Sequence, residues 1–243
     1  MTHTNPIARY FSVIARKGMA FSPRYTDFLF RGISFKGARV LDIGGGAGLL
    51  SFYAACAGAA SVICLEPEAE GADAGIAGEF RRLAAALAAG NVSLSTVTLQ
   101  EFAPGADRFD VVILNNSINH LDEHSCVTLC GDAQSRRSYQ ALFRKIRGMQ
   151  NHGGVIVIAE QAPRNLFRSL GVANPFTPHV EWRKHQSPYL WRRVMESAGY
   201  VAAEIRWEYP LRLGSAARAL MSNRVAAFFY TSRFLLRMRV PAA

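Results

Sequence analysis

The sequence predicts a doubly wound α/β fold, in which helices cover both faces of a mostly parallel sheet. Three observations carry this prediction. Segments with strand character alternate with segments of helical periodicity along the chain. The strands read as continuous apolar runs, without the polar alternation of a sheet that has one face in water. The 243 residues are 50% hydrophobic and 19% charged, which suffices for a large core and excludes a disordered or collagen-like chain.

The elements follow in order from these patterns. Apolar residues at helical spacing predict an amphipathic helix near residues 7–14. Glycines at 58 and 90 mark the ends of two further helices. We expect strands at 39–43, 61–65, 92–99, 110–114 and 155–159, and helices at 49–57, 79–89 and 139–149.

The alternation stops after the strand at 155–159. Residues 161–188 carry several prolines, aromatic rings and charges without a clean period, which predicts an insertion that forms a substrate lid. A helix at 188–198, a strand at 201–207 and a partly helical connection precede a last strand at 225–236. Two final strands joined by a long return predict an antiparallel hairpin at the edge of the sheet.

We therefore expect one domain over residues 1–243, in which residues 1–35 form an N-terminal helical cap. Charge is unevenly distributed along the chain. Residues 1–130 have a net charge of −2, whereas residues 131–243 hold 18 basic and 6 acidic side chains, a net charge of +12. A basic half indicates an anionic partner, such as nucleic acid, a membrane surface or a phosphorylated substrate. Because 24 of the 28 basic residues are arginine, compositional bias explains the same charge.

Cysteine usage and hydropathy indicate a cytoplasmic protein. Four cysteines in a chain of this length are too few for a disulfide framework, so they are expected to be buried thiols in a reducing compartment. Basic residues interrupt the apolar N-terminus, which therefore lacks the core of a signal peptide. The uncharged stretch 43–65 has the length of a membrane span, but its glycines favour a strand, loop, helix and strand. We expect no transmembrane segment. The cysteines are Cys56, Cys64, Cys126 and Cys130.

A glycine loop stands at the end of the first predicted strand. Val40–Gly48 reads VLDIGGGAG, a strand that enters a helix through glycines. Glycines let the backbone approach a ligand, and the helix start offers unpaired N–H groups to an anionic group. A dinucleotide loop needs GxGxxG, but counting from Gly44 the last position falls on Leu49. The GxGxG spacing, with Asp42 two residues before Gly44, suits a ligand that carries an amino acid group and a sulfonium.

This segment resembles the first motif of class I S-adenosylmethionine-dependent methyltransferases. In that family the glycine loop lies against the methionine part of the cofactor, and an acid after the second strand holds both ribose hydroxyls. Glu66 occupies the matching place, directly after the predicted strand 61–65. The resemblance implies S-adenosylmethionine as cofactor and a Rossmann-like sheet of seven mostly parallel strands with an antiparallel edge strand.

The resemblance covers residues 38–209. Residues 97–102 match the place of the family's adenine contacts, but the usual acid is absent, so Leu99 and Gln100 are assigned as adenine neighbours by resemblance only. The cofactor-binding residues that the resemblance implies are Asp42, Gly44, Gly45, Gly46, Gly48, Glu66, Leu99, Gln100 and Asn115.

The segment after the fourth strand bears on the chemistry. Family members that methylate base or amide nitrogens show an Asn/Asp-Pro-Pro-aromatic tetrapeptide there, whereas this chain has Asn-Asn-Ser-Ile at 115–118, which disfavours N-methylation. His120 is the candidate base, because a hydroxyl acceptor must lose its proton as the new bond forms. The alternative is a histidine that packs on or caps the next helix. Asp122 and Glu123 are either functional or first-turn helix acids.

The insertion offers a second cluster, with His179, Glu181 and His185 at positions i, i+2 and i+6. This spacing matches no common zinc pattern, so we expect no metal. In a lid, Glu181 and His185 would contact the acceptor, while Tyr10 and Phe11 would close the other side. A surface elaboration without a role in binding is the alternative.

The sequence thus predicts a biosynthetic S-adenosylmethionine-dependent methyltransferase that acts on a hydroxyl of a small molecule or saccharide. Its catalytic residues would be His120, Glu181 and His185. The basic half leaves open a phosphorylated or lipid-linked glycan acceptor and peripheral contact with a membrane. Two other functions remain. One is an RNA or protein methyltransferase that uses the basic half, although nucleic acid is disfavoured because the sequence shows no separate binding module for it. The other is an inactive subunit that binds the cofactor. The oligomeric state is open.

Overall fold

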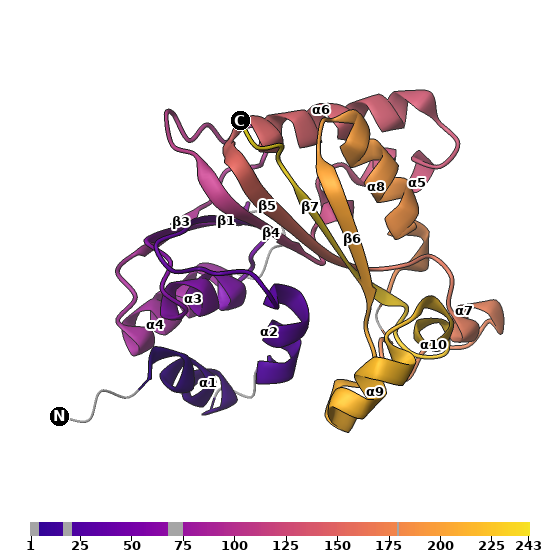
Figure 1. Cartoon of the computed structure of the whole chain (residues 1–243), viewed down its shortest axis with the longest axis horizontal. Coiled ribbons are helices and arrows are strands. Elements are labelled where there is room, and N and C mark those ends of the chain that lie inside the picture. The colour runs from indigo at the N-terminus through magenta and orange to yellow at the C-terminus, as the bar shows by residue number, and fades with distance from the viewer. Residues whose placement is uncertain (1–4, 17–20, 68–74, 179) are drawn as a thin grey trace. The chain divides into compact units, whose positions relative to one another are not determined.

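The computed structural model describes residues 5–16, 21–67, 75–178 and 180–243. Within these residues seven strands form one sheet, in the order β3-β2-β1-β4-β5-β7-β6 (Figure 1). The strands β1, β2, β3 and β4 pair in parallel, whereas the edge strand β6 pairs antiparallel with β7. This is the predicted Rossmann-like, mostly parallel sheet with antiparallel pairing at one edge. The chain divides into two compact units, one within residues 1–114 and 149–154 and one within 115–148 and 155–243.

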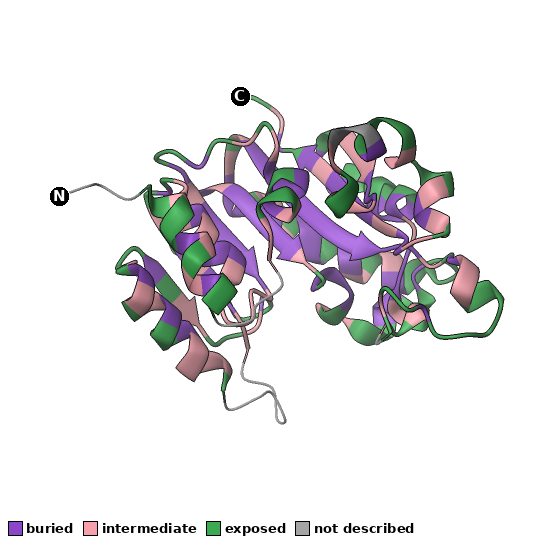
Figure 2. Cartoon of the chain, turned by 90° about the horizontal axis from the view of Figure 1, so that it is seen from below, coloured by how far each residue is buried: buried purple, intermediate pink, exposed green. Residues whose placement is uncertain are grey.

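The first unit carries the parallel strands and four helices of the described residues. Ile43 pairs with Leu65, so β1 and β2 end at the same edge of the sheet. Their side chains are largely buried. Figure 2 shows the strands of the sheet mostly in purple, the colour of buried residues. The elements are α1 (Pro6–Arg16), α2 (Pro23–Phe30), β1 (Arg39–Ile43), α3 (Leu49–Cys56), β2 (Ser61–Leu65), α4 (Ile76–Leu87), β3 (Val92–Ser95) and β4 (Phe109–Asn115).

Aromatic packing fixes α1 and α2 on α3. Tyr10 is wholly buried, and its hydroxyl donates to the carbonyl oxygen of Leu49 at 3.0 Å. The rings of Phe30 and Tyr53 stack with their centroids 5.5 Å apart. The N-terminal helices therefore contribute to the core of this unit, and Tyr10 is a core residue here instead of a side chain open to an acceptor.

The second unit combines the antiparallel strands with the remaining helices. Strand β7 pairs antiparallel with both neighbours, so that Leu236 lies opposite Ile158 and Ile205. Trp191 of α8 is fully buried, with its ring 4.8 Å from that of Tyr139 in α6. The elements are the 3-10 helices η1 (Ile118–His120), η2 (Trp182–Lys184) and η3 (Leu211–Leu213), the helices α5 (Glu123–Thr128), α6 (Ala133–Gly148), α7 (Leu166–Ser169), α8 (Pro188–Ser197), α9 (Gly214–Met221) and α10 (Arg224–Phe228), and the strands β5 (Gln150–Gln161), β6 (Val201–Trp207) and β7 (Arg233–Arg239). Strand β5 belongs to this unit from residue 155 onward, because its residues 150–154 fall in the first unit.

Buried amides fasten the insertion to the rest of this unit. Asn165 is fully buried and donates to the carbonyl of Tyr230 (2.9 Å) and the hydroxyl of Ser232 (3.0 Å). Asn174 donates to the same Tyr230 carbonyl at 2.8 Å. Near the C-terminal end of the insertion, the side chain of Gln186 donates to the carbonyl of Cys126 in α5 at 2.7 Å. These bonds give residues 161–178 and 180–188 a defined course although they contain little regular structure.

Two predicted elements are wrong in part. The last strand was expected at 225–236, but residues 224–228 form α10 and the strand begins at Arg233. Asn223 explains the helix, because its side chain accepts from the backbone N–H of Ala226 at 3.0 Å. Strand β3 ends at Ser95, so residues 96–99 leave the sheet. The uncharged stretch 43–65 forms a loop, α3 and β2, and in the described part of the chain no helix combines the length and apolar character needed to cross a bilayer.

Candidate active site

The glycine loop of the first unit turns sharply from β1 into α3. Gly44, Gly46 and Gly48 have φ angles of 68°, 54° and 79°, in the left-handed region that favours glycine. The backbone N–H of Gly44 donates to the carbonyl of Leu65 at 2.7 Å, which ties the start of the loop to the end of β2. The N–H of Gly48 donates to the carbonyl of Gly45 at 2.9 Å. The loop therefore has a fixed conformation at the carboxyl edge of the parallel strands.

The two faces of the loop differ in the space they leave. A Cβ atom on Gly45 would lie 2.6 Å from Cys64 Sγ and 2.8 Å from Asp42 Oδ2, so this glycine packs against the core. A Cβ atom on Gly46 would meet nothing within 4 Å. Gly46 thus presents bare backbone toward open space, which is the arrangement that lets a ligand approach the chain closely.

Glu66 lies against this loop from the end of β2. Its Oε2 accepts the backbone N–H of Gly46 at 2.8 Å. The carboxylate is half-buried and keeps further acceptor capacity, because an ionised carboxylate offers about four lone-pair sites. Glu66 therefore lies directly after β2 and beside the loop. Its role in binding the ribose hydroxyls stays a prediction.

Asp42 is buried beside the loop, next to Gly45. It is 1% exposed, and the hydroxyl of Ser51 donates to its Oδ2 at 2.7 Å. Burial raises the pKa of Asp42 to about 6, with a smaller contribution from the negative charge of Glu66, while the Ser51 hydrogen bond opposes the rise. An acid that titrates near neutrality at a glycine loop is typical of a functional site, because buried carboxyls are costly to maintain otherwise.

The three remaining predicted cofactor contacts lie in different surroundings. Leu99 is buried in a turn after β3, and its neighbour Gln100 is exposed. Asn115 is the half-buried last residue of β4. Their roles as cofactor contacts stay predictions.

The second unit contains a cavity of about 280 Å³ that brings together all three predicted catalytic residues. His120 reaches it from η1, while Glu181 and His185 reach it from the insertion. We call this cavity the acceptor pocket, because the sequence predicts that these three residues contact the acceptor. His179 lies outside the described residues. The lining residues are Asn116, Asn119, His120, Glu160, Gln161, Thr177, Pro178, Val180, Glu181, Lys184 and His185.

Buried polar atoms without hydrogen-bond partners gather around the acceptor pocket. They are Asn119 Oδ1, Glu160 Oε2, Thr177 Oγ1 and His185 Nδ1, four of the six such side-chain atoms among the described residues. Glu160 is 1% exposed, and its Oε1 accepts the backbone N–H of Gln161 at 2.7 Å. His185 Nδ1 lies 3.1 Å from the same oxygen, at ion-pair distance but without hydrogen-bond geometry. Since buried polar atoms cost stability unless a ligand or water binds them, this concentration makes the pocket a candidate site for a polar ligand.

His120 is held by a chain of charged groups at the pocket. Its Nδ1 lies 2.6 Å from Glu123 Oε1, and its side chain is 55% exposed. Lys184 lies 3.0 Å from Glu123 and 3.1 Å from Glu181. Lys184, followed by His120, holds the pKa of Glu123 below its ordinary value, so Glu123 stays ionised. A carboxylate on Nδ1 fixes the tautomer that leaves Nε2 as the proton acceptor.

Comparison with known proteins agrees with this geometry. A family model of methyltransferase domains matches residues 12–205. The chain belongs to this methyltransferase family. No curated protein matches it. Among solved structures, an S-adenosylmethionine-dependent methyltransferase from Mesorhizobium loti has 17% identity and a TM-score of 0.55, over 85% of this chain and 92% of that one.

Two other structural neighbours of the methyltransferase are longer proteins. The pyocyanin biosynthetic protein PhzM has 17% identity and a TM-score of 0.53, over 88% of this chain and 55% of that one. An O-methyltransferase family protein from Burkholderia thailandensis has 15% identity and a TM-score of 0.59, over 98% of this chain and 60% of that one. The methyltransferase therefore spans little more than half the length of these neighbours.

The glycine loop fits S-adenosylmethionine, the cofactor of this enzyme. The open space at Gly46 leaves room for a ligand against the backbone, and Glu66 stands beside it with acceptor capacity for hydroxyls. The backbone hydrogen bonds of Gly44 and Gly48 and the left-handed glycines fix the backbone that would hold the methionine part.

The sequence reasoning missed Asn119, Glu160, Thr177 and Lys184 of the acceptor pocket. Glu160 gave a signal, because a charged residue directly after a run of buried apolar strand residues is unusual unless it is paired or functional. Asp122 is a helix cap, since its side chain accepts the N–H of Ser125 at 3.0 Å. Among the described residues no group of three His, Cys, Asp or Glu side chains could hold a metal ion.

Proposed function

We propose that this methyltransferase methylates a hydroxyl group of a small molecule or saccharide bound in the acceptor pocket. The four unpartnered buried polar atoms of that pocket carry the proposal. Glu160 Oε2 and Asn119 Oδ1 are hydrogen-bond acceptors, and Thr177 and His185 can accept or donate. Such a lining matches a ligand with several hydroxyl groups, each of which donates one hydrogen bond. The volume of about 280 Å³ suits a molecule of monosaccharide size.

The charged chain at the pocket supports a base-assisted transfer. When bound, S-adenosylmethionine supplies an electrophilic methyl group. His120 Nε2 accepts the proton of the acceptor hydroxyl while the new bond between oxygen and carbon forms. Glu123 holds Nδ1 and stabilises the positive charge that the ring then carries. Glu181 and His185 orient the remaining hydroxyls of the acceptor from the insertion, which serves as a lid.

The test is a screen for methyl transfer to hydroxylated small molecules and saccharides, with formation of S-adenosylhomocysteine as readout. With a substrate from this screen, His120→Ala should lower kcat by about 100-fold, because a general base contributes roughly 10² to 10⁴ in rate. The affinity for S-adenosylmethionine, measured by calorimetry, should stay unchanged in this variant. His124→Ala is the matched control, since His124 is exposed on α5 and does not line the pocket.

Glu66→Ala tests the assignment of Glu66 as a cofactor-binding residue, and unlike His120→Ala it should change cofactor affinity. It should weaken S-adenosylmethionine binding by about tenfold or more, since hydrogen bonds to a charged group contribute about 1.5 to 3 kcal/mol. Transfer to nitrogen acceptors alone, or full activity in His120→Ala, would overturn the proposal. Intact cofactor binding in Glu66→Ala would contradict only the cofactor assignment.

A further inference from the structure

A second and larger cavity lies in the second unit, with a volume of about 640 Å³. It shares no lining residue with the acceptor pocket, although Ala162 and Gln186 of the larger cavity directly follow Gln161 and His185 of the pocket in the chain. We call it the arginine cavity. Its lining residues are Cys130, Ala162, Pro163, Arg164, Gln186, Ser187, Pro188, Tyr189, Leu190, Arg193, Trp207, Arg224, Val225, Phe228 and Ser232.

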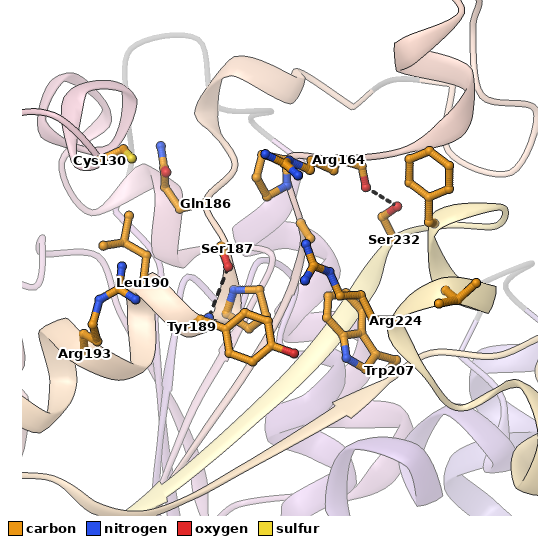
Figure 3. A pocket seen from close by; sticks show the side chains of 15 residues that line it. Cys130, Arg164, Gln186, Ser187, Tyr189, Leu190, Arg193, Trp207, Arg224 and Ser232 are labelled. Carbon is orange, nitrogen blue, oxygen red and sulfur yellow. Dashed lines mark hydrogen bonds between the residues drawn. The ribbon is translucent and has the colours of Figure 1, made fainter.

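Three guanidinium groups face this cavity, and no acidic side chain of the described residues lines it. Arg164 follows β5, Arg193 lies on α8 and Arg224 begins α10, so they come from three separate segments (Figure 3). Each of the three is exposed, and in the part of the chain that the structure describes none of them has a carboxylate partner. Elsewhere on α8, Arg192 is paired with Glu196 at 2.7 Å. Three uncompensated positive charges around one cavity favour an anion.

The other walls of the cavity are aromatic and apolar. Trp207 is buried, with 8% of its surface exposed, and Phe228 and Tyr189 add two further rings. The guanidinium of Arg224 lies 5.8 Å from the centre of the Tyr189 ring, a cation–π arrangement that keeps this charge at the cavity (Figure 3). Flat aromatic walls beside guanidinium groups favour a planar apolar body, because such a body can stack on both.

The start of α8 adds to the positive character of this site. Ser187 caps the helix by accepting the N–H of Tyr189 at 3.3 Å, and residues 187–190 line the cavity. The positive end of the dipole of this ten-residue helix therefore lies at the same cavity as the three arginines.

We propose that the arginine cavity is a second ligand site, which binds an organic anion with a flat aromatic body, such as an aromatic carboxylate. The carboxylate pairs with Arg164, Arg193 and Arg224, and the ring packs on Trp207 and Phe228. This site accounts for part of the excess positive charge of residues 131–243. It goes beyond the proposed methyl transfer, because it concerns binding at residues outside the acceptor pocket.

The experiment is a calorimetric titration of the full chain with 1-naphthoate as probe. Two matched compounds isolate the two parts of the ligand: 1-naphthamide keeps the ring without the charge, and inorganic phosphate keeps the charge without the ring. We expect saturable binding of 1-naphthoate, at least tenfold weaker binding of the other two compounds, and lower affinity at higher ionic strength.

Variants locate the binding. Arg164→Gln, Arg193→Gln and Arg224→Gln should each weaken 1-naphthoate binding by about fivefold to tenfold, because each removes one charge-assisted contact. Arg218→Gln, an exposed residue of α9 outside the cavity, should bind as the wild type does. All four side chains are exposed, so the variants should fold, which circular dichroism checks. Equal binding of 1-naphthamide, or unchanged affinity in the three cavity variants, would overturn the proposal.

Discussion

Asp42 is a residue whose burial works against the stability of the fold. It is 1% exposed, and burial raises its pKa to about 6, from an ordinary value of 3.8. The folded state therefore binds this proton more tightly than the unfolded state does. The stability that Asp42 contributes is fully present below about pH 4 and is lost as the pH rises through about 6. At neutral pH the ionised carboxyl costs stability, which a role at the glycine loop explains.

Replacing Asp42 by asparagine should reveal this cost. An asparagine amide does not titrate, so only the wild type loses this stability as the pH rises. The free energy of unfolding of Asp42→Asn minus that of the wild type should therefore increase between pH 4 and pH 7, by on the order of 3 kcal/mol. Urea unfolding of the cofactor-free protein at both pH values measures the gain. Asp107→Asn is the control, since Asp107 is half-exposed and pairs only at the surface with Arg39. An equal difference at both pH values would show that Asp42 does not titrate in this range.

Single residues also show where sequence reasoning stops. His120, Glu181 and His185 were predicted from residue type and place in the chain, and they line one pocket. Glu160 is not among the predicted residues. A charged residue at the end of an apolar run is a signal, but only the folded chain shows that its Oε2 lacks a partner among the described residues. Unsatisfied hydrogen bonding is a property of three-dimensional packing, so no sequence pattern reports it.

At the scale of elements, two glycines of the loop have different roles: Gly45 packs against the core, whereas Gly46 faces open space that a ligand can enter. Gly45→Ala should lower the free energy of unfolding by about 1 to 3 kcal/mol, because the new Cβ overlaps Cys64 and Asp42. Gly46→Ala should cost about 1 kcal/mol, since its φ of 54° strains an L residue while its Cβ meets open space. Gly46→Ala should nevertheless bind S-adenosylmethionine less well, because its methyl group enters the space beside the loop.

Thermal unfolding and calorimetry on the two variants test this difference. A larger stability loss in Gly46→Ala than in Gly45→Ala would contradict the packing described for the loop. Unchanged cofactor affinity in Gly46→Ala would show that the ligand does not approach on that side.

The same scale explains which elements the sequence could predict. The predicted strands at 39–43 and 61–65 are correct, since apolar runs bounded by glycine or charge fix both of their ends. The predicted strand at 201–207 is also correct, although Glu204 and Arg206 interrupt its apolar pattern. Residues 225–228 were mistaken for a strand because valine and phenylalanine have strand propensity. Asn223 overrides that propensity by capping α10, a local hydrogen bond that hydrophobic periodicity does not register.

At the scale of the whole molecule, residues 131–243 contain more basic side chains than their own acidic side chains can neutralise. Each glutamate of this half lies within 4.0 Å of a basic side chain. Most of the arginines are therefore in excess, and some of this excess gathers at the arginine cavity. These glutamates are Glu160, Glu181, Glu196, Glu204 and Glu208.

Such an excess attracts any polyanion, so binding of nucleic acid alone does not make this enzyme an RNA methyltransferase. A single-stranded RNA of about 20 nucleotides should bind at about 50 mM salt and lose most of its affinity by about 200 mM, as expected for phosphate contacts without base recognition. We expect this RNA to receive no methyl group at either salt concentration. The acceptor pocket, of about 280 Å³, presents buried hydrogen-bond acceptors that suit hydroxyl groups. Among the described residues that line it there is no Phe, Tyr or Trp ring on which a base could stack. Fluorescence anisotropy measures the binding, and transfer of a radiolabelled methyl group measures the reaction. Methylated RNA at 200 mM salt would establish the RNA methyltransferase function in place of the one proposed, and His120→Ala would then show whether the same pocket performs it.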